Sequence, residues 1–551
     1  MADRIQSYKV ISSGGLNSTE NHLDLAENFP GSATRLVNYE AGMYGGYRRI
    51  DGYQPLDTAT ATEFVGTAAE AEGKVLCLAI FRSTLYNNAD LLAARKDVGT
   101  NSYSFYKYLP YAGWSKLDTG TTRAMTSANG FVSVNRIRFV TFNFGDGNKI
   151  AFVDGVNPPI VFDSFTWQEL TVGGAGTSTD GGGDQLVDTP SLIDVFENHI
   201  FLGGDGGQQA IVCHSAPQDP YNFNVAAGAG QLNTGFDVVQ IKPFRDNMFV
   251  FGSNAIKRVS TDLTLGFLLD QVTTNVGCIA ADSVLEIGGD LVFLAPDGLR
   301  PVAGTSRIGD VELETISKSI QALLVDMPAD YDLDSVLVGV VVRTKSQLRY
   351  FMSDASVGIS ESKGIIGGLR TADQKLGWEF GELLGIRASC CTSGYIGRTE
   401  YVLHGDYNGG VYRQEQTNTF NGSGITGIYS TPYFDFGDTE VRKILRRLNT
   451  FIRSEGPLEM NVSVAYDWND TDTAKPASYS QASSGAPIVY AGRDINYSGT
   501  NTKYGGNEKP IMSTDIQGSG YAVKVTFVTL GENSAHSIQG MVFEFSVAGR
   551  R

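Results

Sequence analysis

The stretch RIRFVTFNFGDGNKIAFVDGVNPPIVFDSFTW, residues 136–167, contains three short apolar runs separated by two polar turns. Apolar and polar side chains alternate with a period of two, which predicts strands over Arg136–Phe144, Lys149–Val153 and Pro159–Phe162. The turns carry Asp-Gly and Asn, which tolerate positive φ and are typical of hairpin turns. The stretch therefore predicts a succession of β-hairpins.

Similar paired runs recur along the chain. They lie at 105–116, 247–259, 290–302, 348–380 and 401–413. Units of about 40 to 55 residues are typical of propeller blades. The sequence thus predicts an all-β protein with a β-propeller of roughly six to seven blades. One large β-sandwich, or several sandwiches in series, is the alternative.

The chain divides into three parts. Residues 1–55 are punctuated by glycine and predict an extended N-terminal arm that contributes strands to a platform or ring interface. Residues 56–425 hold the propeller. The composition changes near residue 425, and residues 426–551 predict a second all-β unit, a C-terminal β-sandwich-like domain.

Three segments depart from the strand pattern. Val311–Leu324 has apolar residues at intervals of three and four, which predicts a short amphipathic helix. Val441–Ile452 fits a helix face but follows a strand-like run, so both structures stay open. Gly173–Asp184 is Gly, Ser, Thr and Asp with almost nothing to bury, which predicts a flexible loop.

Composition excludes several classes of protein. The 43 basic and 60 acidic residues give a net charge of −17, which argues against tight, sequence-independent binding to nucleic acid. No apolar run is long enough for a signal peptide or a membrane span. We therefore expect a soluble protein made in the cytoplasm. The five scattered cysteines predict no disulfide framework, and the adjacent pair Cys390 and Cys391 fits a buried strand better than a metal site.

Catalytic motifs are missing. The five histidines have no metal-ligand spacing, and neither a phosphate-binding loop nor a Gly-x-Ser-x-Gly elbow occurs. We expect no catalytic, cofactor-binding or metal-binding residues, and no enzyme. A glycan-cleaving, sialidase-like propeller is the alternative, since it needs only paired carboxylates or a tyrosine nucleophile with arginines. The candidates for that chemistry are Asp297, Glu312, Glu379, Glu382, Asp406 and Tyr407. The repeated aspartate boxes of sialidase-like blades are absent from the sequence.

An ordered set of loose, glycine-rich motifs spans nearly the whole chain. These motifs are Gly14–Asn17, Asn28–Tyr39, Gly45–Tyr53, His214–Phe223, Phe244–Gly252, Val276–Ala281, Phe293–Leu299 and Thr431–Gly437 with Lys443. The set resembles the tail nozzle proteins of short-tailed bacteriophages, also described as tail tubular or tail stabilisation proteins.

The resemblance implies a structural virion protein of the viral tail. It implies a homo-hexameric ring below the portal and its adaptor, the head-to-tail connector, with tail needle, plug or fibre proteins nearby. Genomic DNA would be retained by the ring, and would pass through its channel during DNA ejection without sequence-specific binding. The family has no catalytic residues to carry over. A receptor-binding tail protein is a further alternative.

Two hypotheses concern charge. The acidic balance suggests that acidic groups line the bore and repel DNA, so that it slides without sticking. Basic residues are dense in the arm and in the C-terminal unit against this acidic background. As partner-interface candidates for acidic surfaces of the adaptor or of neighbouring subunits, we take Arg35, Arg48, Arg49, Lys443, Arg446, Arg447 and Arg453.

Overall fold

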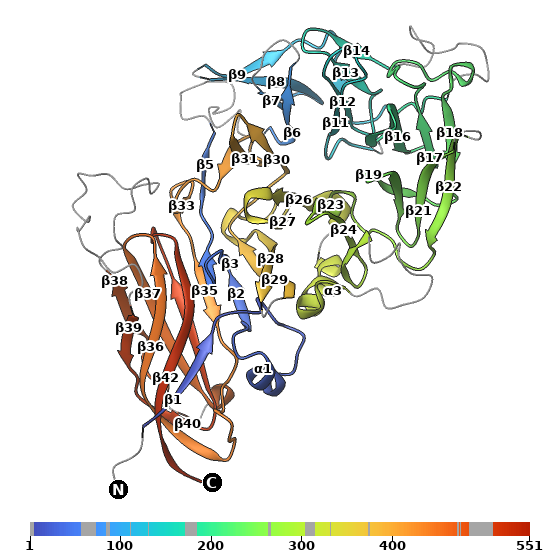
Figure 1. The fold of residues 1–551 in the computed structure, drawn as a ribbon. Coiled ribbons are helices and arrows are strands. Elements are labelled where there is room, and N and C mark those ends of the chain that lie inside the picture. The colour runs from blue at the N-terminus through green and yellow to red at the C-terminus, as the bar shows by residue number, and fades with distance from the viewer. Residues whose placement is uncertain are drawn as a thin grey trace.

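The computed structural model describes most of the chain. The described residues are 5–56, 73–83, 89–97, 99–110, 112–130, 132–170, 185–262, 266–302, 315–330, 332–372, 375–470, 473, 475–483 and 511–550. Six small sheets are arranged in a ring and form a six-bladed β-propeller, which confirms the predicted fold class (Figure 1).

Four of the small sheets follow one another along the chain. They are β6 (Val75–Arg82), β7 (Ala89–Lys96), β8 (Ser102–Leu109), β9 (Gly113–Leu117) and β10 (Arg123–Ala124); β11 (Arg138–Phe142), β12 (Lys149–Val153), β13 (Ile160–Phe162) and β14 (Trp167–Glu169); β15 (Leu192–Phe196), β16 (His199–Asp205), β17 (Gln208–His214) and β18 (Gly230–Asn233); and β19 (Val238–Phe244), β20 (Asn247–Gly252), β21 (Ile256–Asp262) and β22 (Gly266–Thr273).

The other two small sheets include one strand from the arm. They are β23 (Leu285–Ile287), β24 (Asp290–Ala295) and β25 (Gly298–Pro301); and β30 (Cys390–Ile396), β31 (Thr399–Gly405), β32 (Val411–Gln414), β5 (Tyr53–Pro55), β33 (Thr419–Phe420) and β34 (Ser423–Gly424). Strand β5 pairs with β32, so the N-terminal arm supplies the next strand of the last blade.

Two larger sheets complete the described fold, and the nine-stranded one runs from the propeller through the arm into the C-terminal domain. The nine-stranded sheet has the order β26 (Leu337–Val342), β27 (Gln347–Met352), β28 (Lys363–Ala372), β29 (Lys375–Leu384), β2 (Arg35–Val37), β35 (Gly427–Ser430), β41 (Val523–Thr529), β37 (Leu458–Tyr466) and β38 (Tyr479–Ser483). The seven-stranded sheet contains β3 (Tyr39–Ala41), β4 (Tyr47–Arg49), β42 (His536–Arg550), β36 (Val441–Ser454) and β39 (Ile511–Asp515), with β1 (Gln6–Ile11) on β42 and β40 (Ser519–Gly520) on β36.

The first strand of each small sheet lies on the inside of the ring. Strand β6 contacts both β30 and β11, β11 contacts β15, and β15 contacts β19. Strand β26 contacts β23 and β30, so the hairpins β26–β29 of the nine-stranded sheet close the ring between those two blades. Every residue of β12 is buried, because neighbouring blades cover both of its faces.

The arm joins the propeller to the C-terminal domain. Strand β2 pairs with β29 on one side and with β35 on the other, while β1 and β4 both pair with β42. Leu36, Tyr39 and Tyr47 of the arm belong to one hydrophobic core with residues of β27 and β41. The two bodies therefore share a core that the arm completes.

Among the described residues, the helix predicted over Val311–Leu324 is present only in its C-terminal part, where a 3-10 turn at Lys318–Ile320 leads into an α-helix. Of Val311–Leu324, residues 311–314 lie outside the described part, and the α-helix α3 runs over Gln321–Asp330. Ile316 N–H donates to the Leu299 carbonyl and Leu299 N–H donates to Ser317 Oγ, so these residues bind to the edge of β25 instead of starting a helix. Two further short helices are α1 (His22–Asn28) and α4 (Leu333–Val336).

Val441–Ile452 is a strand, part of β36. Register shifts at three places change which residues of the strand face inward. The buried residues Leu445, Leu448 and Ile452 therefore stand at intervals of three and four, as they would in a helix. The loop predicted at Gly173–Asp184 lies outside the described residues. Cys390 and Cys391 begin β30, and neither forms a disulfide.

Candidate functional site

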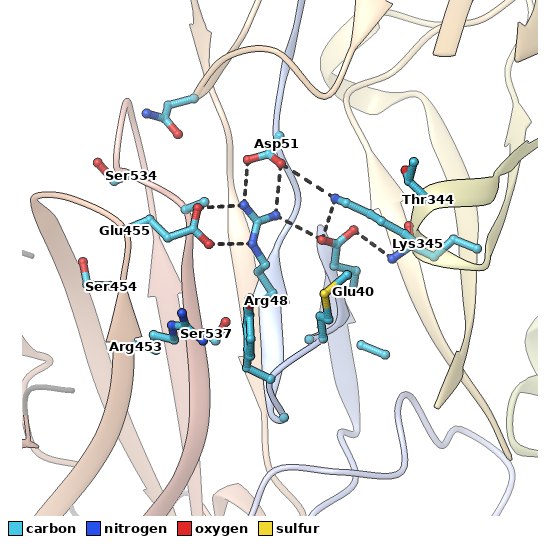
Figure 2. A pocket seen from close by; sticks show the side chains of 18 of the residues that line it. Glu40, Arg48, Asp51, Thr344, Lys345, Arg453, Ser454, Glu455, Ser534 and Ser537 are labelled. Atoms are coloured by element: carbon cyan, nitrogen blue, oxygen red, sulfur yellow. Dashed lines mark hydrogen bonds and ion pairs between the residues drawn. The ribbon is translucent and has the colours of Figure 1, made fainter. Parts of the chain in front are cut away.

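A cleft of about 900 Å³ lies where the three parts of the chain meet. The β3–β4 hairpin of the arm forms one wall, the turn after β26 and the segment after β32 form another, and the ends of β36 and β42 form the third. Figure 2 shows that charged side chains from all three parts point toward one another at its base.

Arg48 is the centre of this charge network. Its guanidinium donates to Glu40 Oε1 at 3.0 Å, to both oxygens of Asp51, and to both oxygens of Glu455 at 2.8 and 2.9 Å. Glu40 and Asp51 come from the arm and Glu455 follows β36 in the C-terminal domain. One side chain that is 16% exposed therefore ties the arm to the C-terminal domain.

Lys345 and Arg349 extend the network into the propeller. Lys345 Nζ lies 2.8 Å from Glu40 Oε1 and also binds Glu415, and Arg349 donates to Glu415 Oε1 at 2.5 Å. Burial opposes ionisation of Glu415, but Lys345 and Arg349 lower the pKa of its carboxyl well below the usual range. Three cations thus hold four carboxylates that come from the arm, the propeller and the C-terminal domain, which is the arrangement of a structural joint.

A second ion cluster crosses the axis of the propeller. Asp282 accepts from Arg136 Nη1 and from Arg138 Nη2 at 2.8 Å and Nε at 3.1 Å, and Arg136 Nη1 also donates to the Leu337 carbonyl at 2.7 Å. The arginines lie at β11, whereas Asp282 precedes β23 and Leu337 begins β26 on the other side of the ring. Burial raises the pKa of Asp282, but Arg138 and Arg136 lower it overall, well below its usual range.

The basic candidates of the arm are not equivalent. Arg35 is exposed on β2, whereas Arg48 belongs to the network described above. Arg49 is fully buried, with one hydrogen bond from Nη2 to Asn418 Oδ1 at 3.2 Å. Burial lowers its pKa. Arg49 is therefore not a surface residue, because the β4 strand that carries it is covered by the propeller and by β42.

The basic candidates of the C-terminal domain also divide into exposed and buried residues. Arg446 and Arg447 are exposed on β36, and Arg447 Nε lies 2.9 Å from Asp515 Oδ1. Arg453 is half-buried and its guanidinium lies 3.8 Å from the ring centroid of Tyr44. Lys443 is buried and donates to two backbone carbonyls, so it too is removed from the candidate surface.

The carboxylates considered for glycan cleavage do not form one described site. Asp297 pairs with Arg300, Glu379 with Arg370 and Asp406 with Arg387. They lie in three different sheets. Burial raises the pKa of the Glu382 carboxyl, and burial raises that of Tyr407 to about 12, the opposite of what a tyrosine nucleophile needs. Glu312 lies outside the described residues.

Further chemistry is limited in the part of the chain that the structure describes. There, no group of three or more His, Cys, Asp and Glu side chains could hold a metal ion. No helix of that part is long and apolar enough to cross a membrane. The fold is that of a multidomain β-propeller protein, and its described charge clusters join separate parts of that fold.

Comparison with known protein families and curated proteins identifies no family for this chain. Neither the models of known protein families nor the curated proteins include a match to this chain.

Proposed function

We propose that the chain is the subunit of a tail nozzle of a short-tailed bacteriophage, a non-enzymatic virion protein. Six copies would form a ring below the portal and its adaptor, with tail needle, plug or fibre proteins nearby. The ring would hold the genome in the head and give it a channel for ejection. The observation that carries the proposal is the arm, because its motifs hold much of the resemblance and its strands join both domains.

The glycines of those motifs support this interpretation, because the packing of the arm requires them. A Cβ on Gly31 would lie 2.0 Å from the Ile11 carbonyl oxygen, and one on Gly52 would lie 1.9 Å from that of Thr419. Tyr47 Oη accepts from Gly15 N–H at 3.0 Å and donates to the Gly31 carbonyl at 2.8 Å. The motif residues thus build one specific path for the arm.

A conduit subunit must resist being pulled apart while DNA is stored and released. The shared core and the network around Arg48 fix the propeller to the C-terminal domain as one body, which suits that task. The net charge of −17 suits a bore that DNA does not adhere to. A bore lined mainly with Lys and Arg would contradict that part of the proposal.

Sizing and negative-stain imaging of the purified full-length chain test the proposal. Rings of six with a central channel are the expected result. Trimers would instead favour a receptor-binding tail protein, and release of sugars from host polysaccharide would favour a glycan-cleaving propeller. Either outcome, or rings that hold duplex DNA tightly at physiological salt, would overturn the nozzle.

A further inference from the structure

The outer face of the seven-stranded sheet carries an apolar row in register. Ile11 of β1 pairs with Gly540 of β42, Gly540 pairs with Phe451 of β36, and Phe451 pairs with Ile511 of β39. Ile11 and Ile511 are each more than half exposed, and Phe451 is 38% exposed. Because the residues between them in each strand point inward, this row lies on the solvent side of the sheet.

The tip of the β3–β4 hairpin extends the row. Met43 and Tyr44 are both more than two-thirds exposed. Gln539, next to Gly540, donates to the Tyr44 carbonyl at 3.4 Å, so the tip lies beside the row. Five large apolar side chains therefore gather on one face, which is more than the scattered single exposures that a surface normally has. We call these five residues the apolar face.

Cations surround the apolar face. Lys9, Arg446, Arg447 and Arg453 lie on β1 and β36, against Glu544 of β42 and Asp515 of β39. Asp515 pairs with Arg447, and Glu544 accepts from Asn449. This excess of positive charge is notable because the whole chain carries −17. A partner for the apolar face should therefore be apolar at its centre and acidic at its rim.

The chain itself exposes such a surface on α1. Leu23 of α1 and Phe29 at its C-cap are both more than half exposed, while Leu25 and Ala26 anchor the helix in the core. The exposed acidic side chains around them are Glu20, Asp24 and Glu27, with Asp326 on α3. Contacts of Thr19 with Ser319 and Ala322 hold α1 against α3. We call this surface the acidic patch.

We propose that the apolar face of one copy binds the acidic patch of a second copy. Figure 1 places α1 to one side of the C-terminal domain and β39 at its opposite edge. The apolar face extends from β39 to Ile11, whose carbonyl lies against Gly31 beside the acidic patch, so the two surfaces are distinct but adjoin along the arm. A contact between two different surfaces joins copies head to tail, and such a contact generates a closed ring when the rotation closes. The contact stands on the two surfaces alone, whereas closure at six copies rests on the proposed function.

Two complementary variants test the contact. Phe451→Glu places a charge in the apolar face and opposes the acidic patch with a like charge, and Leu23→Lys places a cation in the acidic patch opposite the cations around the apolar face. Both side chains are substantially exposed, so neither variant should unfold the chain. Phe165→Glu is the matched control, because Phe165 is 65% exposed in the turn between β13 and β14, away from both surfaces.

Sedimentation or light scattering from about 1 to 100 µM gives the mass of each species. We expect the wild type and Phe165→Glu to associate, and each interface variant to stay a monomer of 59.3 kDa. An equal mixture of the two interface variants has one competent contact and should form dimers but nothing larger. A wild type that stays monomeric, a mixture that stays monomeric, or a Phe451→Glu variant that associates like the wild type would each overturn the contact.

Imaging separates this inference from the proposed function. Rings of six formed equally by the wild type and Phe451→Glu would support the proposed nozzle and refute this contact. Dimers in the mixture, together with open filaments of the wild type, would confirm the contact and refute the proposed ring of six copies. The two failures are therefore distinguishable with the same preparations.

Discussion

Replacement of Asp282 by Asn tests the ion cluster that crosses the propeller axis. The side chains of Arg136 and Asp282 are 8% and 19% exposed, and Arg138 is nearly as buried. The amide would keep the shape of the carboxylate but would remove the negative charge that both guanidinium groups bind. Removing one partner of a buried ion pair typically costs about 3 to 5 kcal/mol. We expect a value near the lower limit, about 3 kcal/mol, since the cluster is partly exposed.

Hydrogen exchange of the backbone amides measures this cost where it arises. A loss of about 3 kcal/mol should raise exchange through local opening roughly 100-fold in β11 and β26, because each 1.36 kcal/mol is a factor of ten. Strands β36 and β42 of the C-terminal domain should keep their protection. Asp270→Asn is the matched control: Asp270 pairs with Arg258 across β21 and β22, and both side chains are at least 41% exposed.

An exposed pair contributes about 1 kcal/mol or less, so the control should change exchange less than tenfold. The reasoning would be refuted if Asp282→Asn and Asp270→Asn had equal effects, or if exchange rose uniformly over the whole chain. Acid provides a second check with a defined sign. Since Asp282 has a lowered pKa in the fold, its contribution is present above the unfolded pKa of about 3.9 and is lost as the pH falls through the folded value.

Three further predictions concern two residues of the arm and the buried His404. Arg48→Met should lower the free energy of unfolding by about 3 kcal/mol because it removes the cation that the buried Glu40 shares with Asp51 and Glu455, leaving Lys345 as the main cation on Glu40. Glu455→Gln should cost about 1 kcal/mol or less, and denaturant titration of both variants decides. Gly46→Ala should make the β3–β4 hairpin sensitive to proteolysis, because the new Cβ would lie 2.2 Å from the Ile538 carbonyl oxygen. Gly120→Ala is the control and should stay resistant, because Gly120 has a similar positive φ but no atom within 4 Å of the position that a Cβ would take. Burial lowers the pKa of His404 to about 3, so below about pH 6.5 the imidazole takes up a proton in the unfolded chain but not in the folded one, and stability is lost as the pH falls. Between pH 7 and pH 5 the free energy of unfolding of the wild type should fall by about 2 kcal/mol more than that of His404→Phe. Denaturant titration of both proteins at both pH values measures the difference.

The hairpins of the propeller were predictable because their signals are local. The three strands predicted within residues 136–167 correspond to β11, β12 and β13, with turns at the Asp-Gly and Asn positions. Strand β36 was ambiguous for an equally local reason, since its bulges place buried residues at helix-like spacing. The sequence pattern records which residues are buried but not the register shifts that bury them.

The charge network was not predictable, because its partners are far apart in the chain. Glu40 and Arg349 are 309 residues apart, and their contact exists only after the arm has returned to the propeller. One signal was present: Arg349 stands inside the apolar run LRYFM and must find a buried counter-charge there. The same reasoning separates the basic candidates, since Arg49 and Lys443 also lie within strands whose neighbours are buried.

The closed axis of the propeller constrains how any conduit could be built from this chain. Asp282 joins Arg136 and Arg138 across the ring, and Arg138 also donates to the Ser191 carbonyl at 3.1 Å, so side chains from several blades occupy the axis. DNA could not pass there without breaking buried ion pairs. A channel must therefore lie between copies of the chain, and the surfaces that join the copies decide its width and its charge. For this reason the contact between the apolar face and the acidic patch is the feature on which a nozzle made of this protein would depend.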